Sequence, residues 1–545
     1  MTDLPYATLL ARALKARGVT HAFGMPDGAT SPFLDAFRAV GIDFVCVRHA
    51  GAAGVMADAA FRITRAPGVC IATLGSGATH LVSGIARSLR ERSKLVAITH
   101  QVSTALRDHH THPVLDQVAL FKPVSRRVVH LQEPMAAMQT LTALAALDRQ
   151  TPGPVVLEVP SEVATTTIPD AQPEWGLRAR PRPVPEVRAA AERLRSARNP
   201  LVVVGGAEAS IAVSNGVRRL VQASNAVALT TCRAAGMTDD SHPLWAGTFG
   251  LSPVVDANQR ALFQQSDLMV AIGLDTAELP TRWLPGWPEN LPIIRIDAFD
   301  QPGLPGTVVD SLTGPMMETL DALCEAAFGP TPEDDPDAVL HTTAWSEAAL
   351  TAHRTACAVP FHDGPDGPAA TIRAVQEGSP PGTRISLDAG AHHVTAAQVL
   401  RADTPNQLLQ SNGATSMGTS LPGAIASRLV DARTPAVALT GNAGLSMALG
   451  ELGIAQERTL NLVVVCLADC PLSLIHHPED HGDQPHQSVP SIHPNVEPLA
   501  AAYGGVGVTV QGADAVREAV YAAHERGGLS IIEARIDPAP FRRQM

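Results

Sequence analysis

Short apolar runs alternate with amphipathic segments along the whole chain. The runs at residues 44–47 and 68–73, for example, each precede a predicted helix, which lies near residues 51–64 in the first case. Apolar runs separated by roughly ten to fifteen residues of helical period are typical of parallel strands that helices cover on both faces. The chain therefore predicts an α/β fold built from parallel sheets.

The apolar runs fall into three blocks, which we predict to be three doubly wound domains. The N-terminal block covers residues 1–165, the central block 186–330 and the C-terminal block 365–545. Proline-rich segments at 169–185 and 329–337 separate them and are expected to be linkers, because they cannot hold regular secondary structure. The main predicted strands are residues 44–47, 68–73, 94–99 and 154–159, then 201–206, 268–273 and 293–297, then 384–388, 436–440 and 462–467.

Composition and charge exclude several classes of protein. Among the 545 residues, Lys and Arg number 41 and Asp and Glu 53, which gives a net charge of −12 without any basic run. This balance argues against binding to nucleic acid or to a membrane surface. No apolar run approaches the ~18 residues of a membrane helix. Seven scattered Cys form no disulfide framework and residues 1–18 lack a signal-peptide pattern, so we expect a cytoplasmic protein.

Two predicted strands of the third block end in residues that suit a bound phosphate and a metal ion. Residues 436–440 run into Gly441-Asn442-Ala443-Gly444, and residues 462–467 run into Asp469. Neighbouring parallel strands bring such ends together at one sheet edge. Small residues there let backbone N–H groups approach a phosphate, and Asn442 and Asp469 can offer oxygen ligands to Mg²⁺. A tight turn with a capping Asp is the plain alternative.

This layout resembles the thiamine diphosphate (ThDP) enzymes of the acetolactate synthase and pyruvate decarboxylase type. Their signature is Gly-Asp-Gly followed by Asn-Asn, in which the Asp and the second Asn bind the metal ion. Here those positions are Asn442 and Asp469, 27 positions apart, so the acid and the amide have changed places. The pair still carries one negative charge, which suits Mg²⁺. The resemblance adds the backbone carbonyl of Pro471 as a third ligand.

The resemblance covers nearly the whole chain, with six segments in the family's order over some 450 residues. Residues 19–28 resemble the "VFGVPGG" opening, 72–81 the "ATSGPGATNL" turn, and 387–393 (LDAGAHH) the segment that reaches the diphosphate. In residues 411–422 (SNGATSMGTSLP), Met417 falls where a large apolar side chain bends the cofactor, although core packing is the alternative. The resemblance thereby implies cofactor contacts for Gly28, Thr73, His80, Ala391, His392, Thr415, Met417, Gly441, Ala443, Gly444 and Ile475.

The most informative departure from the family is at Ala50. The family reads Arg-His-Glu where this chain has Arg48-His49-Ala50. The family's Glu hydrogen-bonds the aminopyrimidine ring of the cofactor and promotes its activation, whereas alanine can neither donate, accept nor titrate. Glyoxylate carboligase is the family precedent for an apolar residue at this catalytic position. An inactive site is the other interpretation, although the reciprocal exchange of Asn442 and Asp469 favours catalysis.

Histidines supply the candidates for proton transfer. His109 and His110 match a His-His pair of the pyruvate decarboxylases, in which an acid follows seven residues later, as Asp116 does here. Imidazole, with a pKa near ~6.5, suits proton transfer to an alkoxide; the alternative is a structural pair. His476 lies in residues 475–493, which correspond to the family's helix and loop over the active site. A metal site formed by His476 and nearby acids and histidines is less consistent with the spacing than a polar lid.

The central block gives no sign of a dinucleotide. Val204-Gly205-Gly206 lacks the full G-x-G-x-x-G motif. Acetolactate synthases bind FAD partly through an Arg-Phe-Asp-Asp-Arg segment, and this chain has Leu-Asp-Thr-Ala-Glu-Leu at residues 274–279 instead. We therefore predict no FAD.

The sequence thus predicts a ThDP- and Mg²⁺-dependent carboligase or lyase. It would decarboxylate a 2-oxo acid and join the remainder to an aldehyde or ketone, as an acetolactate synthase does. The alternatives are a simple decarboxylase, for example of a sulfonated or phosphonated pyruvate, and a ThDP-binding scaffold without activity. Because cofactor sites of the family lie between the first block of one subunit and the third block of another, the resemblance also implies a homodimer or homotetramer.

Overall fold

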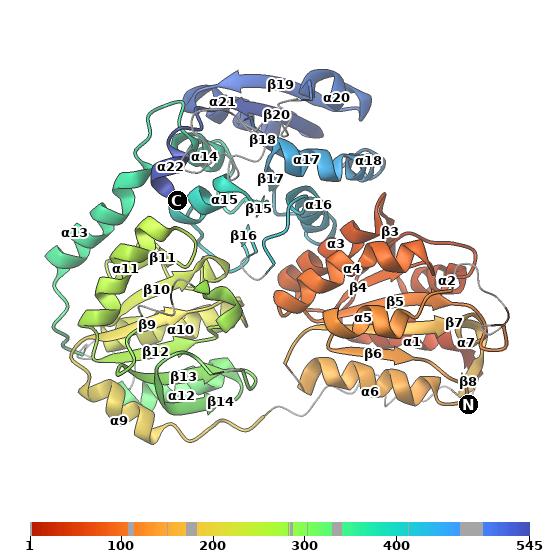
Figure 1. Cartoon of the computed structure of the whole chain (residues 1–545), viewed down its shortest axis with the longest axis horizontal. Coiled ribbons are helices and arrows are strands. Elements are labelled where there is room, and N and C mark those ends of the chain that lie inside the picture. The colour runs from red at the N-terminus through yellow and green to blue at the C-terminus, as the bar shows by residue number, and fades with distance from the viewer. Residues whose placement is uncertain are drawn as a thin grey trace.

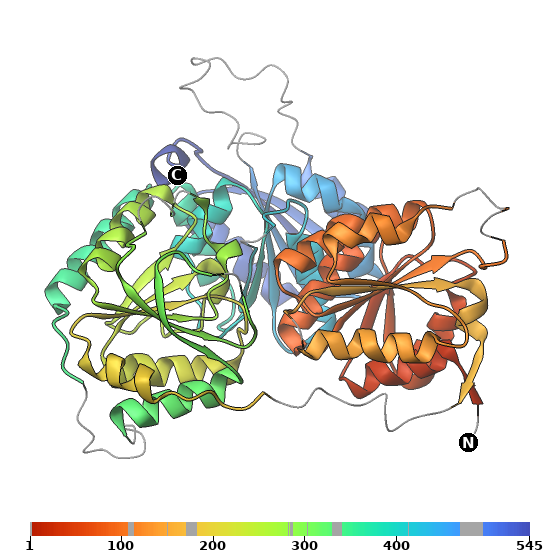
Figure 2. The same cartoon turned by 60° about the horizontal axis from the view of Figure 1, so that its bottom comes forward.

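The computed structural model of the chain describes residues 3–106, 109, 114–149, 151–169, 182–281, 283, 287–301, 303–329, 341–411, 414–468 and 494–545. Three six-stranded parallel sheets, each flanked by helices, form three lobes (Figures 1 and 2). This confirms the predicted class of three doubly wound α/β units. The limits 1–165, 186–330 and 365–545 of the blocks stay a prediction, and we keep the names first, middle and third block for the three lobes.

The first block carries the sheet of order β3-β2-β4-β5-β7-β6. Its strands are β2 (His21–Gly24), β3 (Asp43–Cys46), β4 (Gly68–Ala72), β5 (Leu95–Gln101), β6 (Arg127–His130) and β7 (Pro154–Pro160). Its helices are α1 (Tyr6–Ala16), α2 (Ser31–Val40), α3 (Ala50–Thr64), α4 (Ser76–Arg90), α5 (Gln117–Phe121), α6 (Ala136–Arg149) and α7 (Ser161–Thr165). Strands β1 (Asp3–Pro5) and β8 (Thr167–Pro169) form a separate antiparallel pair.

The middle block carries the sheet of order β11-β10-β9-β12-β13-β14. Its strands are β9 (Pro200–Val204), β10 (Val227–Thr231), β11 (Trp245–Phe249), β12 (Leu268–Ile272), β13 (Pro292–Asp297) and β14 (Thr307–Thr313). Its helices are α9 (Arg188–Ser196), α10 (Ile211–Ser224), α11 (Pro253–Gln265) and α12 (Met316–Phe328), with short 3₁₀ turns η2 (Cys232–Ala234) and η3 (Thr276–Glu278). Helix α13 (Glu347–Ala358) follows and leads into the third block (Figure 1).

The third block carries the sheet of order β16-β15-β17-β18-β20-β19. Its strands are β15 (Arg384–Leu387), β16 (Leu408–Leu409), β17 (Ala436–Gly441), β18 (Leu462–Ala468), β19 (Val506–Gln511) and β20 (Leu529–Arg535). Its helices are α14 (Pro368–Glu377), α15 (Ala391–Val399), α16 (Ser420–Val430), α17 (Asn442–Ala448), α18 (Leu452–Glu457), α20 (Val496–Ala502), α21 (Ala513–Arg526) and α22 (Phe541–Gln544), and η6 (Leu449–Glu451) lies between α17 and α18.

Glycine and alanine let helix α3 approach its neighbours closely. A methyl group added at Gly68 of β4 would lie 2.1 Å from the carbonyl oxygen of Ala57 in α3. Between α3 and α4, a methyl group at Gly54 would lie 2.7 Å from Cα of Gly84. Only hydrogen fits at these contacts, because protein interiors are close-packed. The small residues therefore set how closely α3 packs against β4 and α4, and both helices begin in segments that carry predicted site residues.

The first and third blocks share one hydrophobic core. Ala53 and Met56 of α3 belong to the same buried cluster as Leu421 and Ile425 of α16. Figure 1 shows α16 beside α3, where the blue and red parts of the chain meet. Apolar burial is worth about 25 cal/mol per Å², so this core joins the two blocks firmly. Among the described helices, none combines the length and apolar character that a membrane crossing requires.

Candidate cofactor site

The carboxyl ends of β15, β17 and β18 lie side by side in the third block. Residue Leu387 pairs with Leu439, and Gly441 pairs with Leu467, in parallel register. The chain turns into α15 one residue after Gly390 and into α17 directly at Asn442. The predicted meeting of the ends of residues 436–440 and 462–467 is confirmed, and the edge of the sheet is the place where ligands bind in such folds.

Asp388 is the centre of this edge. Its carboxylate accepts hydrogen bonds from the backbone N–H groups of Gly418 and Thr419, both at 3.0 Å. It also accepts one from the hydroxyl of Thr440 at 2.9 Å. The side chain of Asp388 is 1% exposed, so these donors replace water around a buried acid. Asp388 thereby ties the start of α16 and the end of β17 to the end of β15.

His392 lies in the first turn of α15 with an unsatisfied nitrogen. Its side chain is buried, and Nε2 has no hydrogen-bond partner among the described residues. Burial lowers the pKa of His392, while the carboxylate and the backbone carbonyl of Asp388 oppose this shift. The neighbouring His393 is also buried, and burial together with His392 lowers its pKa to about 4. An anion placed at Nε2 could accept a hydrogen bond from His392 and would favour its protonated form.

Glycines let the segments pack closely at the same edge. A methyl group added at Gly444 would lie 1.8 Å from Oδ2 of Asp388. One added at Gly441 would lie 3.5 Å from Cε1 of His392. The chain therefore needs glycine at 444 to bring α17 against Asp388. Ala391 and Asn442 open α15 and α17, whose first N–H groups stand at the adjacent ends of β15 and β17.

Asn442, the predicted metal ligand, is described, whereas its predicted partners Asp469 and Pro471 lie outside the described residues. The side chain of Asn442 is buried, and its Oδ1 accepts a hydrogen bond from the thiol of Cys466 at 3.0 Å. The strand β18 thus orients the amide oxygen. Within the described part of the chain, no three His, Cys, Asp or Glu side chains gather as a metal site.

The segment with Thr415 and Met417 reaches the same edge. Gly418 N–H is bonded to Asp388, and Thr415 has a φ of 42°, in the left-handed region. Met417 is half-buried and Thr415 is exposed. A non-glycine residue in this region costs about 1 kcal/mol, so other contacts must hold Thr415 in place. The structure therefore brings together the predicted residues His392, Thr415, Met417, Gly441, Asn442 and Gly444 at one sheet edge.

The predicted residues of the first block gather at the carboxyl edge of another sheet. Ala50 opens α3 and is fully buried. The rings of His49 and His80 stack beside it, with centroids 4.8 Å apart, and both side chains are exposed. Burial and the neighbouring His80 lower the pKa of His49. Thr73 directly follows β4, and a methyl group at Gly77 would lie 2.2 Å from its hydroxyl, so this turn is also tight.

Glu451 anchors the start of α3 to the third block. Its carboxylate accepts hydrogen bonds from the backbone N–H groups of Arg48 at 3.1 Å and His49 at 2.9 Å. Glu451 is 2% exposed, and this burial raises its pKa. Arg48 also pairs with Glu457 of α18. A carboxylate thus lies at the start of α3, although the residue at position 50 has none.

We expect Ala50→Glu to lower the free energy of unfolding by about 2 kcal/mol, because position 50 is fully buried and Glu451 already occupies the nearby N–H groups. Urea unfolding of the cofactor-free protein measures this. Ser76→Glu is the matched control, since it adds the same charge at the exposed start of α4 and should change stability little. An Ala50→Glu protein that is as stable as the parent and turns over faster would show that Ala50 is damage rather than adaptation.

The remaining predicted residues divide between the surface and the undescribed segments. Gly28 is exposed, with no atom within 4 Å of an added methyl group, and Ala443 is half-buried at the third-block edge. His109 is exposed. His110, Ile475 and His476 lie outside the described residues, so their predicted roles remain predictions.

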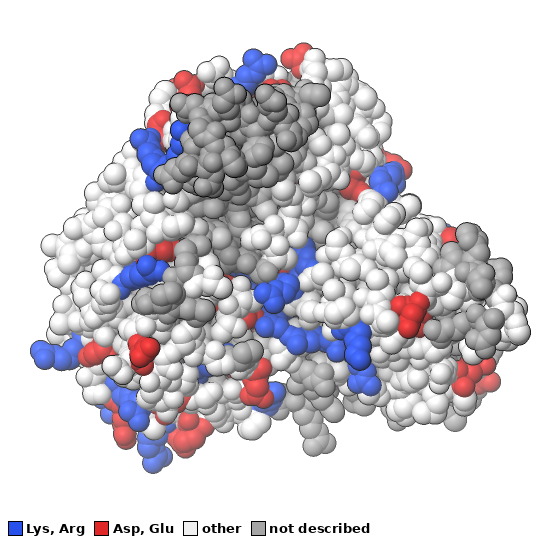
Figure 3. Space-filling model, viewed as in Figure 1, with Lys and Arg blue, Asp and Glu red and all other residues white. Residues whose placement is uncertain are grey.

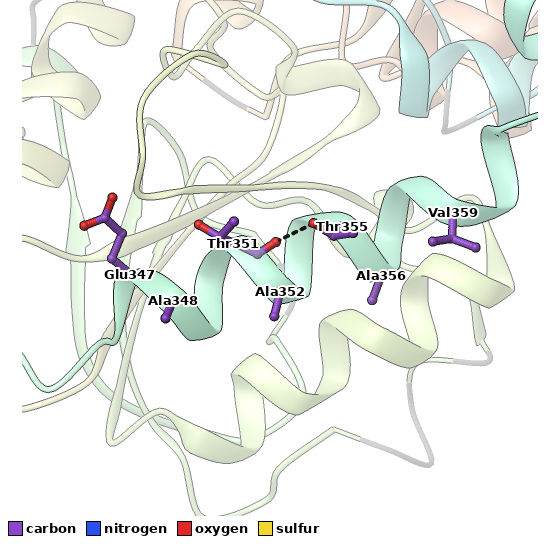
Figure 4. A pocket seen from close by; sticks show the side chains of 7 residues that line it. All are labelled: Glu347, Ala348, Thr351, Ala352, Thr355, Ala356 and Val359. Atoms are coloured by element: carbon purple, nitrogen blue, oxygen red, sulfur yellow. Dashed lines mark hydrogen bonds between the residues drawn. The ribbon is translucent and has the colours of Figure 1, made fainter.

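A separate hollow is lined by none of these residues. It runs along the outer face of α13, has a volume of about 780 Å³, and is lined by small side chains such as Ala348, Ala352 and Thr355 (Figure 4). In Figure 4 the side chains of Ala348, Ala352 and Ala356 lie along one side of α13, and the threonine side chains lie on the other. The hollow therefore offers surface without converging polar groups and is not the candidate site.

Comparison with known proteins agrees with the geometry. Three models of thiamine pyrophosphate (that is, ThDP) enzymes match the chain: the N-terminal TPP binding domain at residues 5–120, the central domain at 187–302 and the C-terminal TPP binding domain at 388–534. The chain is 27% identical over 525 residues to the acetolactate synthase isozyme 3 large subunit of Escherichia coli, covering 94% of this chain and 90% of the relative. The catabolic acetolactate synthase of Raoultella terrigena is 25% identical, covering 97% and 95%.

The fold and the site together define a cofactor-dependent α/β enzyme. The chain belongs to the thiamine pyrophosphate enzymes, as the resemblance of its motifs predicted. ThDP with Mg²⁺ is the cofactor of this family. The residues of this chain fit it, because the orphaned Nε2 of His392 and the glycine-lined start of α17 meet at one edge and suit a diphosphate.

Sequence reasoning missed three buried acids of this region, namely Asp388, Glu451 and Glu91. Asp388 is the last residue of the predicted strand 384–388, and a polar residue at a strand end is a signal that could have singled it out. Glu451 and Glu91 lie at helix ends, where an acid usually faces solvent, and only their burial at 2% shows that they have structural partners.

Residues 274–279, which stand where the resemblance places an FAD-binding motif, contact the first block. Asp275 pairs with Arg92, at 2.5 Å from its Nε, and Glu278 lies 3.6 Å from Nη1 of Arg233. Both carboxylates are fully buried. The residues at 274–279 thus form ionic contacts within the chain, and the absence of FAD stays a prediction.

Proposed function

We propose that the protein is a ThDP- and Mg²⁺-dependent carboligase that decarboxylates a 2-oxo acid and joins the product to a second carbonyl compound, in the manner of an acetolactate synthase. The observation that carries the proposal is the gathering of Asp388, His392, Asn442 and Gly444 at the edge of β15 and β17. The likeness to acetolactate synthases over more than nine-tenths of the chain supports the carboligase rather than the simple decarboxylase or the inactive scaffold.

The third block would hold the cofactor. The N–H groups at the start of α15 and α17 and Nε2 of His392 would bind the diphosphate, and Asn442, Asp469 and the carbonyl of Pro471 would hold Mg²⁺. Asp388 would keep this edge rigid through its bonds to Gly418, Thr419 and Thr440. Bound ThDP would supply a carbon nucleophile for the carbonyl group of the 2-oxo acid and a cationic ring that can take up the electron pair left when CO₂ departs.

The first block would complete the site. Ala50 leaves an apolar surface where the family carries an acid, so it would exclude water rather than exchange a proton. Thr73 and His80 border the same strand ends. By analogy with the family, these residues would face the third block of a second copy, which makes a homodimer the smallest active unit. We place this assembly in the cytoplasm, since the six described cysteines are all free thiols.

A product analysis tests the proposed function. The purified protein with ThDP and Mg²⁺ is incubated with pairs of 2-oxo acids and aldehydes, and products are identified by mass spectrometry. A new carbon–carbon bond together with released CO₂ supports the carboligase. Release of CO₂ and an aldehyde alone would indicate a decarboxylase, and no turnover of any pair by ThDP-loaded protein would indicate a scaffold.

We expect His110→Ala to lower kcat by about 10² while ThDP affinity stays within a few-fold, because a carboligase needs a proton donor for the new alkoxide. Steady-state kinetics and calorimetry measure the two quantities. His109→Ala is expected to have a similar or smaller effect, and His242→Ala in the middle block is the control. If both variants keep kcat within a few-fold of the parent, the pair is structural, and proton transfer passes to His476 or water.

A further inference from the structure

A buried ionic cluster joins the three blocks beside the cofactor site. Glu91 caps the C-terminal end of α4, and one oxygen of its carboxylate lies 3.0 Å from Nε of Arg233 in η2. Nη2 of Arg233 also donates to the backbone carbonyl of Glu91 at 2.7 Å. Glu91 is 2% exposed and Arg233 is 5% exposed. Figure 3 shows Lys and Arg side chains gathered over this junction of the first and middle blocks.

The cluster keeps Glu91 ionised inside the protein. Burial alone would raise the pKa of Glu91, but the guanidinium groups of Arg233, Arg87 and Arg62 hold it below its ordinary value. Arg233 in turn lies between two acids, Glu91 and Glu278. A buried charge that is paired in this way has a fixed position, because moving it would leave its partner unpaired at a high cost.

The other oxygen of Glu91 reaches the third block. The hydroxyl of Ser411 donates to Oε1 of Glu91 at 2.5 Å, and the N–H of Ala414 lies 3.3 Å from the same oxygen. The Ser411 oxygen itself accepts from the N–H of Thr415 at 3.1 Å. These bonds hold Thr415 in its left-handed conformation, two residues before Met417. The middle block is therefore connected to the Thr415–Met417 segment through Arg233, Glu91 and Ser411.

We propose that Glu91, held by Arg233, is a positioning residue that sets the Thr415–Met417 segment and thereby the affinity for ThDP. The inference rests on the proposed function in taking that segment as part of the cofactor site. Glu91 reaches this segment through the hydroxyl of Ser411 and the N–H of Ala414, and Ser411 in turn accepts the N–H of Thr415. The middle block then contributes to cofactor binding without touching the cofactor.

The experiment compares Ser411→Ala, Ser411→Thr, Glu91→Gln and the double variant Ser411→Ala/Glu91→Gln. Calorimetry gives the ThDP affinity in the presence of Mg²⁺ and without substrate. Hydrogen exchange of the peptide covering residues 408–421 is followed in cofactor-free protein. Thr140→Val is the matched control, because it removes a buried hydroxyl that bonds Tyr6 at 2.7 Å in a distant part of the first block.

We expect Ser411→Ala and Glu91→Gln each to weaken ThDP binding about tenfold, the size of one lost hydrogen bond to a charged group. The double variant should resemble Ser411→Ala, since Glu91→Gln loses only the charge and can act on the segment only through the bond that Ser411→Ala has already removed. The peptide should exchange faster in cofactor-free Ser411→Ala, and Ser411→Thr should resemble the parent because it keeps a hydroxyl. Thr140→Val should lower stability without changing ThDP affinity.

Affinities of Ser411→Ala within twofold of the parent, with unchanged exchange of the peptide, would overturn the inference, as would effects that multiply in the double variant. If Glu91→Gln fails to fold, the comparison of Ser411→Ala with Ser411→Thr decides alone. The proposed function is judged separately by product analysis. If the variants weaken ThDP binding as expected but the parent forms no carbon–carbon bond, the carboligase is refuted and the positioning role of Glu91 stands.

Discussion

Replacing Asp388 with Ala is expected to lower the free energy of unfolding by about 3 kcal/mol and to weaken ThDP binding about 100-fold. The variant leaves the N–H groups of Gly418 and Thr419 without their acceptor in a buried place, and each such group costs roughly 1–3 kcal/mol. It also removes the acid that opposes the lowered pKa of His392. Urea unfolding of the cofactor-free protein and calorimetry with ThDP and Mg²⁺ measure the two effects.

Two further variants make this result specific. Asp388→Asn keeps the size and one carbonyl oxygen, so it should fall between the parent and Asp388→Ala. Asp431→Ala removes a partly exposed acid of the same block, which bonds Thr434 and Arg384 away from the sheet edge, and should alter stability without altering ThDP affinity. An Asp388→Ala protein that binds ThDP as tightly as the parent would show that the buried acid does not organise the site.

We expect ThDP binding to depend on a divalent cation. Chelation of divalent cations should release ThDP, and Mg²⁺ should restore it, because the diphosphate and the protein share the ion. Asp469→Ala should weaken ThDP binding about tenfold more than Asn442→Ala, since it removes the only charge among the proposed metal ligands, worth ~1–4 kcal/mol. Calorimetry with and without a chelator measures this, and ThDP bound equally well without metal would refute the site.

Exchanging the acid and the amide between positions 442 and 469 provides a control for the metal-site variants. The double variant Asn442→Asp/Asp469→Asn keeps one carboxylate and one amide and restores the order found in the family's signature. We expect it to bind ThDP within about threefold of the parent, since the pair's charge is unchanged. The thiol of Cys466 can donate to an aspartate at position 442 as it does to Asn442. Binding reduced to the level of Asp469→Ala would mean that the two positions are not equivalent.

The sequence by itself determined the fold class, many of the central strands and several residues of the candidate site. Runs such as residues 94–99 and 436–440 became β5 and β17, because burial on both faces of a parallel strand requires continuous apolar residues. The order of the strands placed Asn442 at a sheet edge. The replacement of a family acid by Ala50 is likewise visible in the chain, since it needs only the residue type at one position.

Only the tertiary structure decided which polar groups support that site. Glu451 binds the N–H of a residue 402 positions away, and Glu91 binds Ser411 across 320 positions. Asp388 likewise accepts a hydrogen bond from the N–H of Thr419, which lies 31 positions later in the chain. Apolar periodicity is a local property that one segment displays alone, whereas a buried charge is stable only with partners that packing brings to it. The sequence shows that these acids exist, and the packing of three blocks determines what each one holds.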